Sequence, residues 1–512
     1  MESDVVLEEV TNVRLRVATL NCWGLPQPYP LGSRDRRHRI SKIADELATG
    51  RYDLVALQEV WDEGDFDKIA ERVKRVLPYS HMFHSGLVGS GVVAFSRYPL
   101  LGVLMHRYSL NGFAHHVHHG DWFGGKVAGL AQVRVRTPAK DVFVNLYSTH
   151  IHAEYDAADD VYLAHRLAQA YELSQFVRQT SSGADVTVVT GDLNMEPSDL
   201  GLRIVLANGG LEDAWLCGQQ LDKQRAYDSG ATCERPDNVY TAQSALRSFP
   251  EGKRIDYILF RSDSVDCKVK LRRCEVCLNK IAGEVDDMNY SDHVGVYAEF
   301  DIRKRGQSRH RRQGSAATKR SLDDSSLWSR GAGDAPRSSA AVPQAVEQAD
   351  ADAAPAALSP ATAQLPPTAT VEAVLVNDKP FTCLMEEEAA LEAGAEAEEE
   401  GALGPSADGL RRLFSEAIQI IEAAEERAKW DVRLYALAVA LLLVVFVVTI
   451  LLETSFPFLA IPAILVRILL TMLLVFCLWY GFVGLRLELK ALKEAKQGMR
   501  LRLRSEIPYP EE

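Results

Sequence analysis

The chain has 512 residues, of which 47% are hydrophobic, so it is long enough for two to four domains of roughly 100–200 residues and is not disordered throughout. Its formal net charge of −13 divides into −8 over residues 1–303, −7 over 304–408 and +2 over 409–512. The acidic first segment argues against a surface that binds duplex nucleic acid through phosphate contacts. The eight scattered cysteines exclude a disulfide scaffold and favour a reducing compartment.

Residues 12–303 have the pattern of a single α/β domain. Seven short apolar, β-branched runs are bounded by turn residues, as strands are. They are RVATLN, YDLVALQE, GVVAFS, VFVNLYSTH, DVTVVTGDLN, RIDYILF and VGVYAEF. Apolar residues keep helical spacing over Arg39–Leu47 and Val161–Val177. Many short strands with few helices predict a sandwich of two β-sheets flanked by helices.

Residues 304–408 change composition, first to Arg, Ser and Gly, then to Ala, Pro and Ser, and finally to an acidic run from Glu386 to Glu400. This composition predicts a disordered linker. Its basic opening is compatible with binding an anionic lipid activator or with a nuclear address, although a solvated linker is favoured. Residues 409–433 then show helical spacing of apolar residues, which predicts a juxtamembrane amphipathic helix.

Two apolar stretches near the C-terminal end have the length of transmembrane helices. Residues 434–452 run for 19 residues without a charge, and residues 463–484 follow after a short connector. The second stretch carries one charge, Arg467, near its start. A long side chain there can snorkel to the interface, and a functional charge is the less favoured alternative.

Basic residues flank both ends of this predicted hairpin. Arg427, Lys429 and Arg433 precede the first stretch, and seven Lys or Arg occur in the twenty residues after Gly484, within a predicted basic tail at 485–512. The positive-inside rule therefore predicts a multi-pass membrane protein with both termini and the α/β domain in the cytosol. The short first span favours the endoplasmic reticulum.

Polar residues recur at the C-terminal ends of the predicted strands, with Asp256 inside RIDYILF and with Asp292 and His293 just before the last run. The set is Asn21, Glu59, His150, Asp192, Asn194, Asp256, Asp292 and His293. One polar residue at a strand end is ordinary, but several of one chemical type predict a shared functional edge.

The chemistry of this set favours a hard cation and a base. Carboxylate and amide oxygens without cysteine suit Mg²⁺ or Mn²⁺ rather than zinc. Glu59, with Asn21 and Asp292 as neighbours, would leave several positions for water and a substrate phosphate oxygen. A histidine near acids, with an aspartate to orient its second ring nitrogen, has the layout of a general base that activates water. Together these features predict phosphoester hydrolysis.

The motifs that contain these residues resemble those of a known superfamily. The order of the motifs and their spacing resemble those of the endonuclease/exonuclease/phosphatase superfamily. These motifs are LNCWG, LQEVW, STHIHAEY, GDLN, RIDY and SDH. Within it, LNCWGLP, THIHAEY, YLAHR, GDLNMEP and RIDYILF, followed by a C-terminal hairpin, resemble the neutral sphingomyelinases of the two-span type. The resemblance covers about residues 12–303 and 430–485, and it implies the DNase I-like two-sheet fold.

The resemblance implies a metal site and a base. Glu59 would be the main Mg²⁺ ligand, with Asn21 and Asp292 helping directly or through water. His293 would take the proton from the attacking water, and Asp256 would orient its ring.

The resemblance also implies how the phosphate is handled. Asp192 and Asn194 would position the water and the phosphate. His150 would stabilise the phosphorane or assist the departing alkoxide. Water would attack phosphorus in line, and ceramide would leave through its C1 oxygen.

Gly120–Val127 (GDWFGGKV) matches the opening of a nucleotide P-loop, but Val127 stands where Ser or Thr should hold Mg²⁺, so an ATP site is disfavoured. The resemblance places a similar loop near the active site, which makes Lys126 and Asp121 candidates for substrate binding, with a plain surface turn as an equal alternative. His152 is a third candidate, with a packing histidine as its alternative. A basic stretch is expected to be a solvated loop rather than a lipid-phosphate site: Arg34, Arg36, Arg37 and Arg39.

The leading hypothesis is a membrane-embedded, Mg²⁺-dependent phospholipase C-type enzyme whose membrane sphingolipid substrate is sphingomyelin. The same chemistry on inositol phosphosphingolipid or on lysophospholipids is the first alternative. A nuclease of the superfamily is the second, and the charge of −8 and the hairpin argue against it, so no nucleic-acid partner is expected. An inactive membrane scaffold is disfavoured because the acids and both key histidines are present. Truncation after about Arg303 is expected to yield a soluble, active protein.

Overall fold

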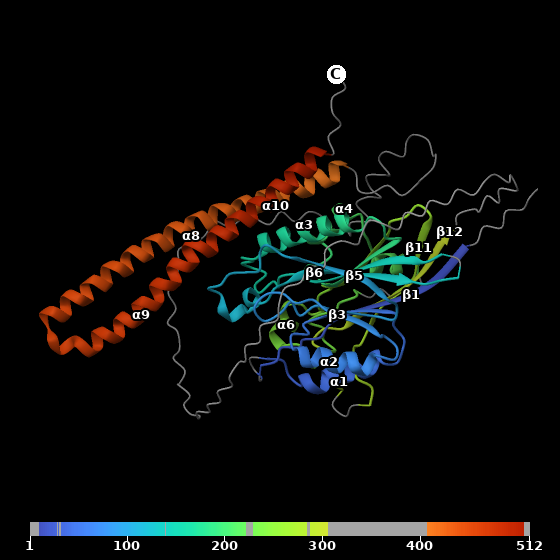
Figure 1. Cartoon of the computed structure of the whole chain (residues 1–512), viewed down its shortest axis with the longest axis horizontal. Helices are drawn as coiled ribbons and strands as arrows, with labels where there is room; N and C mark the ends of the chain where they lie inside the picture. The colour runs from blue at the N-terminus through green and yellow to red at the C-terminus, as the bar shows by residue number, and fades with distance from the viewer. Residues whose placement is uncertain are drawn as a thin grey trace, which may run out of the picture. The chain divides into compact units, whose positions relative to one another are not determined.

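The computed structural model describes residues 10–505, with gaps at 28, 30–31, 139, 222–228, 284–286 and 306–406. The predicted linker 304–408 therefore lies almost wholly outside the described residues. In the described part of residues 10–305, strands form two six-stranded sheets (Figure 1). Their strand orders are β11-β12-β1-β2-β4-β3 and β5-β6-β7-β8-β10-β9.

The first sheet is antiparallel except for the β1–β2 pair, which is parallel. Its strands are β1 (Val10–Asn21), β2 (Leu54–Gln58), β3 (Tyr79–Met82), β4 (Val93–Ser96), β11 (Cys267–Cys277) and β12 (Gly295–Arg305). Every residue of β2 is buried, because β2 lies in the middle of the sheet and both of its faces are covered.

The second sheet is likewise antiparallel except for the β7–β8 pair. Its strands are β5 (Leu100–Arg107), β6 (Val127–Val135), β7 (Val142–His150), β8 (Val186–Asp192), β9 (Glu212–Asp213) and β10 (Asp256–Ser262). The edge strand β5 has no buried residue, whereas all of β8 is buried.

Helices α1 (Arg36–Leu47) and α2 (Glu63–Val73) pack on the outer face of the first sheet, and α3 (Leu163–Thr180) and α4 (Leu200–Gly209) pack on the outer face of the second. Helix α5 (Ala214–Leu221) packs against β10 and β11 at the margin of the core between the sheets, and α6 (Gln243–Ser248) has no buried residue. Short 3₁₀ turns lie at Val117–His119 and Asp121–Phe123. One apolar core lies between the sheets, a second joins the first sheet to α1 and α2, and a third joins the second sheet to α3 and α4. The predicted two-sheet sandwich flanked by helices is confirmed.

The parallel pairs bring the functional residues to one edge. Because β1 and β2 run in the same direction, Asn21 lies opposite Gln58, the residue before Glu59. In the second sheet, His150 at the end of β7 lies opposite Asp192 at the end of β8. The antiparallel strands β10 and β12 begin at this edge, so Asp256 pairs directly with Asp192. The C-terminal ends of β1, β2, β7 and β8 and the N-terminal ends of β10 and β12 therefore meet at this edge.

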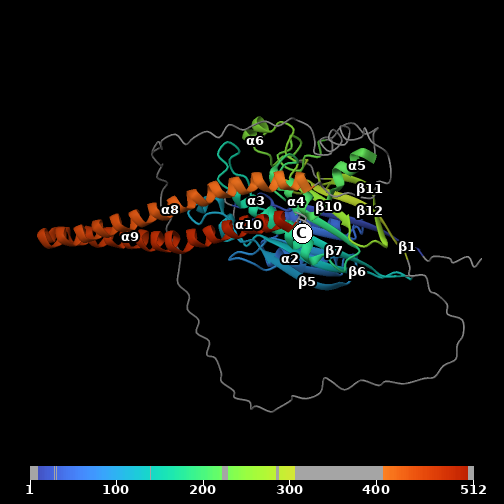
Figure 2. The same cartoon turned by 90° about the horizontal axis from the view of Figure 1, so that it is seen from above.

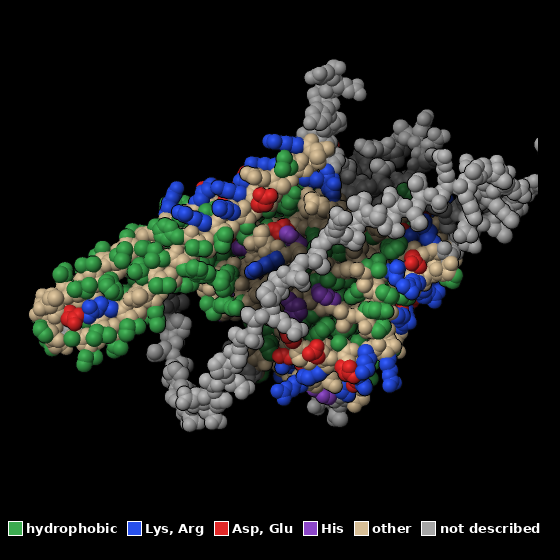
Figure 3. All heavy atoms as spheres, in the orientation of Figure 1, with side chains coloured by type: hydrophobic (Ala, Val, Ile, Leu, Met, Phe, Trp, Pro, Cys, Tyr) green, Lys and Arg blue, Asp and Glu red, His purple; other side chains and the backbone are tan. Residues whose placement is uncertain are grey.

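The C-terminal part is helical. It consists of α8 (Ala407–Ser455), a 3₁₀ turn (Pro457–Leu459), α9 (Ala460–Trp479), a π-helical turn (Tyr480–Gly484) and α10 (Leu485–Ser505). Helix α8 is continuous across the predicted amphipathic segment 409–433 and the first predicted span. Two helical stretches are long and apolar enough to cross a membrane, and almost none of their apolar windows is buried. Figure 3 shows nearly continuous hydrophobic surface over α9 and the adjoining half of α8, with Lys and Arg gathered nearer α10.

Arg467 is paired rather than alone. Its guanidinium forms an ion pair with Glu453 near the end of α8, and its Nε lies 3.2 Å from the carbonyl oxygen of Ala463. A charge in a membrane span is usually paired in this way, because an isolated one is costly. The pair links the two predicted spans near their connection.

Helices α8 and α10 pack on α3 and α4, beyond the second sheet (Figure 2). The buried residues of this contact, which we call the docking face, include Leu167, Tyr171 and Ile204 on one side and Leu413, Phe414, Ile421, Leu492 and Met499 on the other. On α8, Leu410, Leu413, Phe414, Ala417 and Ile421 recur at helical spacing, so a single stripe is covered. A fragment truncated after Arg303 would expose the α3–α4 side of this face, which argues against the expectation that it is soluble.

Candidate active site

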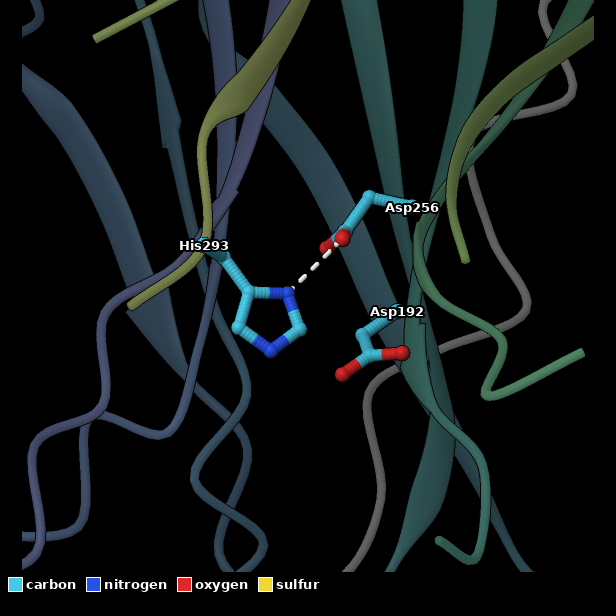
Figure 4. Close-up of side chains that lie close together, drawn as sticks. All are labelled: Asp192, Asp256 and His293. Carbon is cyan, nitrogen blue, oxygen red and sulfur yellow. Dashed lines mark hydrogen bonds and ion pairs between the residues drawn. The ribbon is translucent and has the colours of Figure 1, made fainter. Parts of the chain in front are cut away.

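A histidine and two aspartates meet at the functional edge (Figure 4). His293 Nδ1 lies 2.8 Å from Asp256 Oδ2, which fixes the orientation of the imidazole ring. Asp192 lies beside this pair, and the three groups offer ligand atoms within 4.8 Å of one another. The backbone of Asp256 is also fixed in place, because its N–H donates a hydrogen bond to Thr232 Oγ1 at 3.1 Å. The sequence prediction of a histidine oriented by Asp256 matches this geometry.

The surroundings of His293 favour its charged form. Burial lowers the pKa of His293, but Cys233 and Asp256 outweigh burial and raise that pKa well above its ordinary value. Burial and the neighbouring Asp256 both raise the pKa of Asp192. The Asp256 carboxylate therefore acts on both neighbours, because it raises the pKa of His293 and the pKa of Asp192.

Asn21 joins the two sheets. Its Nδ2 donates to Glu59 Oε1 and to Asp192 Oδ2, both at 2.9 Å, and its Oδ1 accepts from the backbone N–H of Trp23 at 3.0 Å. Only 1% of the surface of Asn21 is exposed, so both its amide nitrogen and its amide oxygen bond to groups inside the protein. It therefore fixes the distance between a carboxylate of the first sheet and one of the second.

The backbone around Glu59 is strained. Glu59 and Trp23 both have positive φ, 58° and 46°, in a region that non-glycine residues seldom adopt. Gly24 approaches Glu59 so closely that a Cβ on it would overlap the Glu59 carbonyl oxygen. Strain of this kind persists where the surrounding structure holds a side chain in a required position. The LNCWG motif thus shapes the turn that presents Glu59.

The GDLN turn presents Asp192 and Asn194. A Cβ on Gly191, whose φ is 139°, would overlap the carbonyl oxygen of Thr149, so only glycine allows β8 to lie this close to β7. Asn194 has a φ of 47°, donates its backbone N–H to Asp192 Oδ1 and donates Nδ2 to the carbonyl oxygen of Ile151, each at 2.9 Å. The turn is therefore tied to the end of β7.

His150 faces Asp192, and its surroundings favour the uncharged imidazole. Its Nε2 lies 3.5 Å from Asp192 Oδ2, while its buried Nδ1 has no hydrogen-bond partner among the described residues. Burial lowers the pKa of His150 well below its ordinary value, and the nearby Lys126 lowers it further. A neutral imidazole can donate one hydrogen bond to an oxygen that gains negative charge.

Lys126 is buried rather than part of a surface turn. Its Nζ donates to the carbonyl oxygen of Ile151 at 2.9 Å and lies 3.2 Å from Asp121 Oδ1. Asp121 Oδ2 is also 3.5 Å from His152 Nδ1. Burial raises the pKa of Asp121, but Lys126 and His152 outweigh it, so that the pKa lies below its usual range. The three weaker candidates thus form one cluster adjoining the ends of β7 and β8.

Asp292 occupies the loop before β12. Its carboxylate accepts from Ser291 Oγ at 3.1 Å, and Asn238 Nδ2 donates to the carbonyl oxygens of Ser291 and Asp292 at 2.9 and 3.1 Å. Burial raises the pKa of Glu59, and the Asp292 carboxylate raises it further. Asp292 therefore lies close enough to Glu59 for the two negative charges to repel each other.

Arg39 corrects the prediction of a solvated basic loop. It lies on α1, is fully buried, and donates to the carbonyl oxygens of Cys22 and Trp23 at 2.7 Å and of Tyr290 at 3.1 Å. One guanidinium therefore clamps the LNCWG turn to the loop that carries Asp292. The signal was present in the sequence, because Arg39 shares the helical spacing of Ile43 and its neighbours on the buried side of α1.

The edge fits a hard divalent cation. Its donors are carboxylate and amide oxygens, and burial together with mutual repulsion penalises their negative charge, which a cation would relieve. Asp256 Oδ1 is buried without a hydrogen-bond partner among the described residues. The closest group of ligand-type side chains is Asp192, Asp256 and His293, whereas the sequence indicated Glu59, Asn21 and Asp292.

Two sheets with acids, amides and histidines at their common edge define a metal-assisted phosphoesterase. Residues 18–293 match the profile of the endonuclease/exonuclease/phosphatase family. The chain belongs to this family, and the membership predicted from LNCWG, GDLN and SDH is confirmed.

Curated relatives carry more specific names. The chain is 53% identical over 298 residues to a putative neutral sphingomyelinase of Caenorhabditis elegans, covering 56% of this chain and 67% of that one. It is 39% identical over 294 residues to sphingomyelin phosphodiesterase 2 of Mus musculus, covering 57% and 66%. It is 32% identical over 303 residues to an inositol phosphosphingolipids phospholipase C of Schizosaccharomyces pombe, covering 56% and 69%. The matched part thus spans about two thirds of each relative.

Proposed function

We propose that the chain hydrolyses sphingomyelin to ceramide and phosphocholine in a Mg²⁺-dependent, phospholipase C-type reaction at a membrane surface. The observation that carries the proposal is the His293–Asp256 contact of 2.8 Å beside Asp192, at the edge where Asn21 holds Glu59. The names of the relatives support a phosphosphingolipid substrate, and the apolar helices support a membrane location.

His293 is the general base in this proposal. Asp256 holds Nδ1, which leaves Nε2 to accept the proton of the attacking water. The new bond forms between the water oxygen and phosphorus, and the bond between phosphorus and the ceramide C1 oxygen breaks. Asp192 and Asn194, tied to each other at 2.9 Å, orient the water and the phosphate.

His150 assists at the phosphorane or at the departing oxygen. Its neutral ring donates a hydrogen bond to a phosphoryl or leaving oxygen as negative charge develops there. Lys126 is a cation close enough to His150 to lower its pKa, and the ion pair with Asp121 holds Lys126 next to the end of β7. Lys126, Asp121 and His152 are proposed to bind substrate through this cluster.

Glu59 would hold Mg²⁺, with Asn21 and Asp292 contributing directly or through water. When bound, the ion supplies positive charge that neutralises the phosphate oxygens and helps to orient them. Mn²⁺ has the same preference for oxygen ligands and is expected to substitute.

A location follows from the charge pattern. Basic residues at both ends of the hairpin support a topology in which the termini and the catalytic domain lie in the cytosol. The endoplasmic reticulum is the proposed organelle, and activation by an anionic lipid stays a prediction.

A product assay tests the proposal. The full chain in detergent is supplied with sphingomyelin, inositol phosphosphingolipid, a lysophospholipid and duplex DNA, each with Mg²⁺ and with EDTA. We expect phosphocholine from sphingomyelin in Mg²⁺, none in EDTA, and restored release when Mg²⁺ is added back. Full activity in EDTA, or cleavage of DNA alone, would contradict the proposal.

The second candidate substrate is inositol phosphosphingolipid. It is favoured by one observation, the 32% identity to the Schizosaccharomyces pombe phospholipase C over 303 residues. A rate on this lipid greater than on sphingomyelin would select it, because the chemistry at phosphorus is the same and only the head group differs.

A further inference from the structure

The loop between β5 and β6 contacts both the active site and the C-terminal helices. Asp121 in this loop pairs with Lys126 at 3.2 Å, next to the end of β7. The next residue, Trp122, places its ring 5.6 Å from Trp479 in an edge-to-face contact. Earlier in the loop, His115 lies 5.0 Å from Tyr480, also edge to face. We call Trp122, His115, Trp479 and Tyr480 the aromatic junction.

The helical side of the junction is well packed. Tyr480 is only 2% exposed, stacks on Phe476 at 5.8 Å and meets Tyr435 of α8 at 5.2 Å. Its position is the first residue of the π-helical turn that separates α9 from α10. Such turns are rare in proteins, and those that occur often lie at functional sites. The turn therefore coincides with the contact to the active-site loop.

The docking face is a second attachment, distinct from the junction. Phe414 of α8 is fully buried and lies edge to face with Tyr171 of α3 at 5.8 Å. Polar contacts accompany it: Arg502 Nε donates to Asn208 Oδ1 at 3.3 Å, and Arg427 Nη2 donates to the carbonyl oxygen of Val161 at 3.2 Å. Two attachments on different elements oppose rotation of the catalytic domain about either one.

The junction lies where the helices change from covered to exposed. Beyond it, α8 and α9 present apolar side chains such as Leu437 and Leu465 that are 67% and 64% exposed. Trp479, 41% exposed, and Tyr435 are of the aromatic types that gather at membrane interfaces. The active-site loop thus meets the helices at the level where the hairpin would enter the bilayer.

We propose that the junction and the docking face hold the catalytic domain against the membrane, so that the chain hydrolyses lipid only in the bilayer that contains its own hairpin. Because the two attachments lie on different elements of the catalytic domain, they fix its distance and its orientation relative to the hairpin. The lipid's identity rests on the proposed function, whereas the docking does not.

A comparison of two vesicle mixtures tests this proposal. The full chain is reconstituted with Mg²⁺ either in phosphatidylcholine vesicles that contain sphingomyelin, or in vesicles without it that are mixed with sphingomyelin acceptor vesicles. We expect phosphocholine release at least about tenfold faster in the first sample. Equal initial rates in the two samples would overturn the proposal.

A cross-link provides a readout that needs no activity. The variant Trp122→Cys/Trp479→Cys is treated with a short bis-maleimide in vesicles, with each single variant as the background control. A matched control is Trp122→Cys/Leu501→Cys, because Leu501 is 64% exposed and lies 16 residues, roughly 24 Å, along α10 from Leu485. We expect an intramolecular link for the first pair only.

The outcomes separate the two proposals. A link at Trp122–Trp479 without phosphocholine release from sphingomyelin would contradict the proposed function and uphold the docking. Release without the link, or equal linking of both pairs, would contradict the docking and leave the proposed function standing.

Discussion

The active-site edge and the docking face are both buried and both join elements far apart in the sequence, but they are built differently. The edge is polar: Asn21 alone bridges Glu59 and Asp192 with two hydrogen bonds of 2.9 Å. The docking face is apolar, with Leu, Ile and Ala side chains around Phe414, and a face of this kind tolerates exchanges among apolar residues. Polar geometry requires particular residues, whereas apolar burial requires only shape and spacing. Sequence motifs therefore indicate the active-site edge, whereas no motif indicates the docking face.

The largest expected effect lies at the edge. His293→Ala removes the base, and we expect turnover to fall by about 10²–10⁴-fold, because general-base catalysis contributes this much. The rate is measured as phosphocholine release, and the melting temperature is expected to stay close to that of the parent. His106→Ala, at a partly exposed histidine paired with Glu172, is the matched control and should retain turnover. A near-normal rate for His293→Ala would refute the assignment of the base.

Asp256→Asn tests the coupling within the edge. The base must be neutral to accept a proton, so activity rises with pH through the pKa of His293, which Asp256 helps to raise. Removing that carboxylate should move the acidic limb of the pH–rate profile to lower pH and reduce kcat. Glu172→Gln, which alters the partner of His106 instead, should leave the limb in place. A shift to higher pH would contradict the assigned contact.

Truncation after Arg305 sharpens the difference between the two regions. It leaves the edge intact but uncovers Leu167, Tyr171 and Ile204 on α3 and α4. Each apolar side chain loses roughly 1.5–3 kcal/mol of burial. We expect the fragment to aggregate without detergent while retaining turnover in it. A monomeric, detergent-free fragment by light scattering would show that the docking face contributes little.

The smallest expected effect on turnover concerns one ion pair between α8 and α10. Lys496 Nζ lies 2.8 Å from the buried Glu425 Oε2, and Lys496→Met leaves that carboxylate without its cation. The loss is at most roughly 3–5 kcal/mol and is confined to the helical region. We expect faster proteolysis within α10 and unchanged turnover in detergent. Lys493→Met, at an exposed position, is the control.

The sequence predicted the residues of the edge because each adjoins an apolar run, although Asp256, Asp292 and His293 lie where strands begin rather than where they end. The runs ending in Asn21 and Asp192 form β1 and β8, and the helix predicted from Val161 to Val177 is α3, Leu163–Thr180. Strands β3, β5, β6, β9 and β11 and helices α2, α4, α5 and α6 were not predicted, since they carry none of the motifs. Arg39 was misjudged because a cluster of arginines resembles a solvated loop until the helix buries one of them.

The docking face was beyond reach for a related reason. The apolar stripe from Leu410 to Ile421 predicts a helix that needs cover, but a membrane surface would cover it equally well. Only the structure shows that α3, α4 and α10 do so. The aromatic junction likewise joins residues more than 350 positions apart in the chain, with no local signal for their pairing.

The most direct test of the central claim follows the oxygen of the attacking water. The full chain hydrolyses sphingomyelin in water enriched in ¹⁸O, with Mg²⁺ present, and both products are examined by mass spectrometry. Attack at phosphorus by a water that His293 deprotonates predicts one ¹⁸O atom in each phosphocholine and none in ceramide. Label in ceramide, or no phosphocholine at all, would contradict the account.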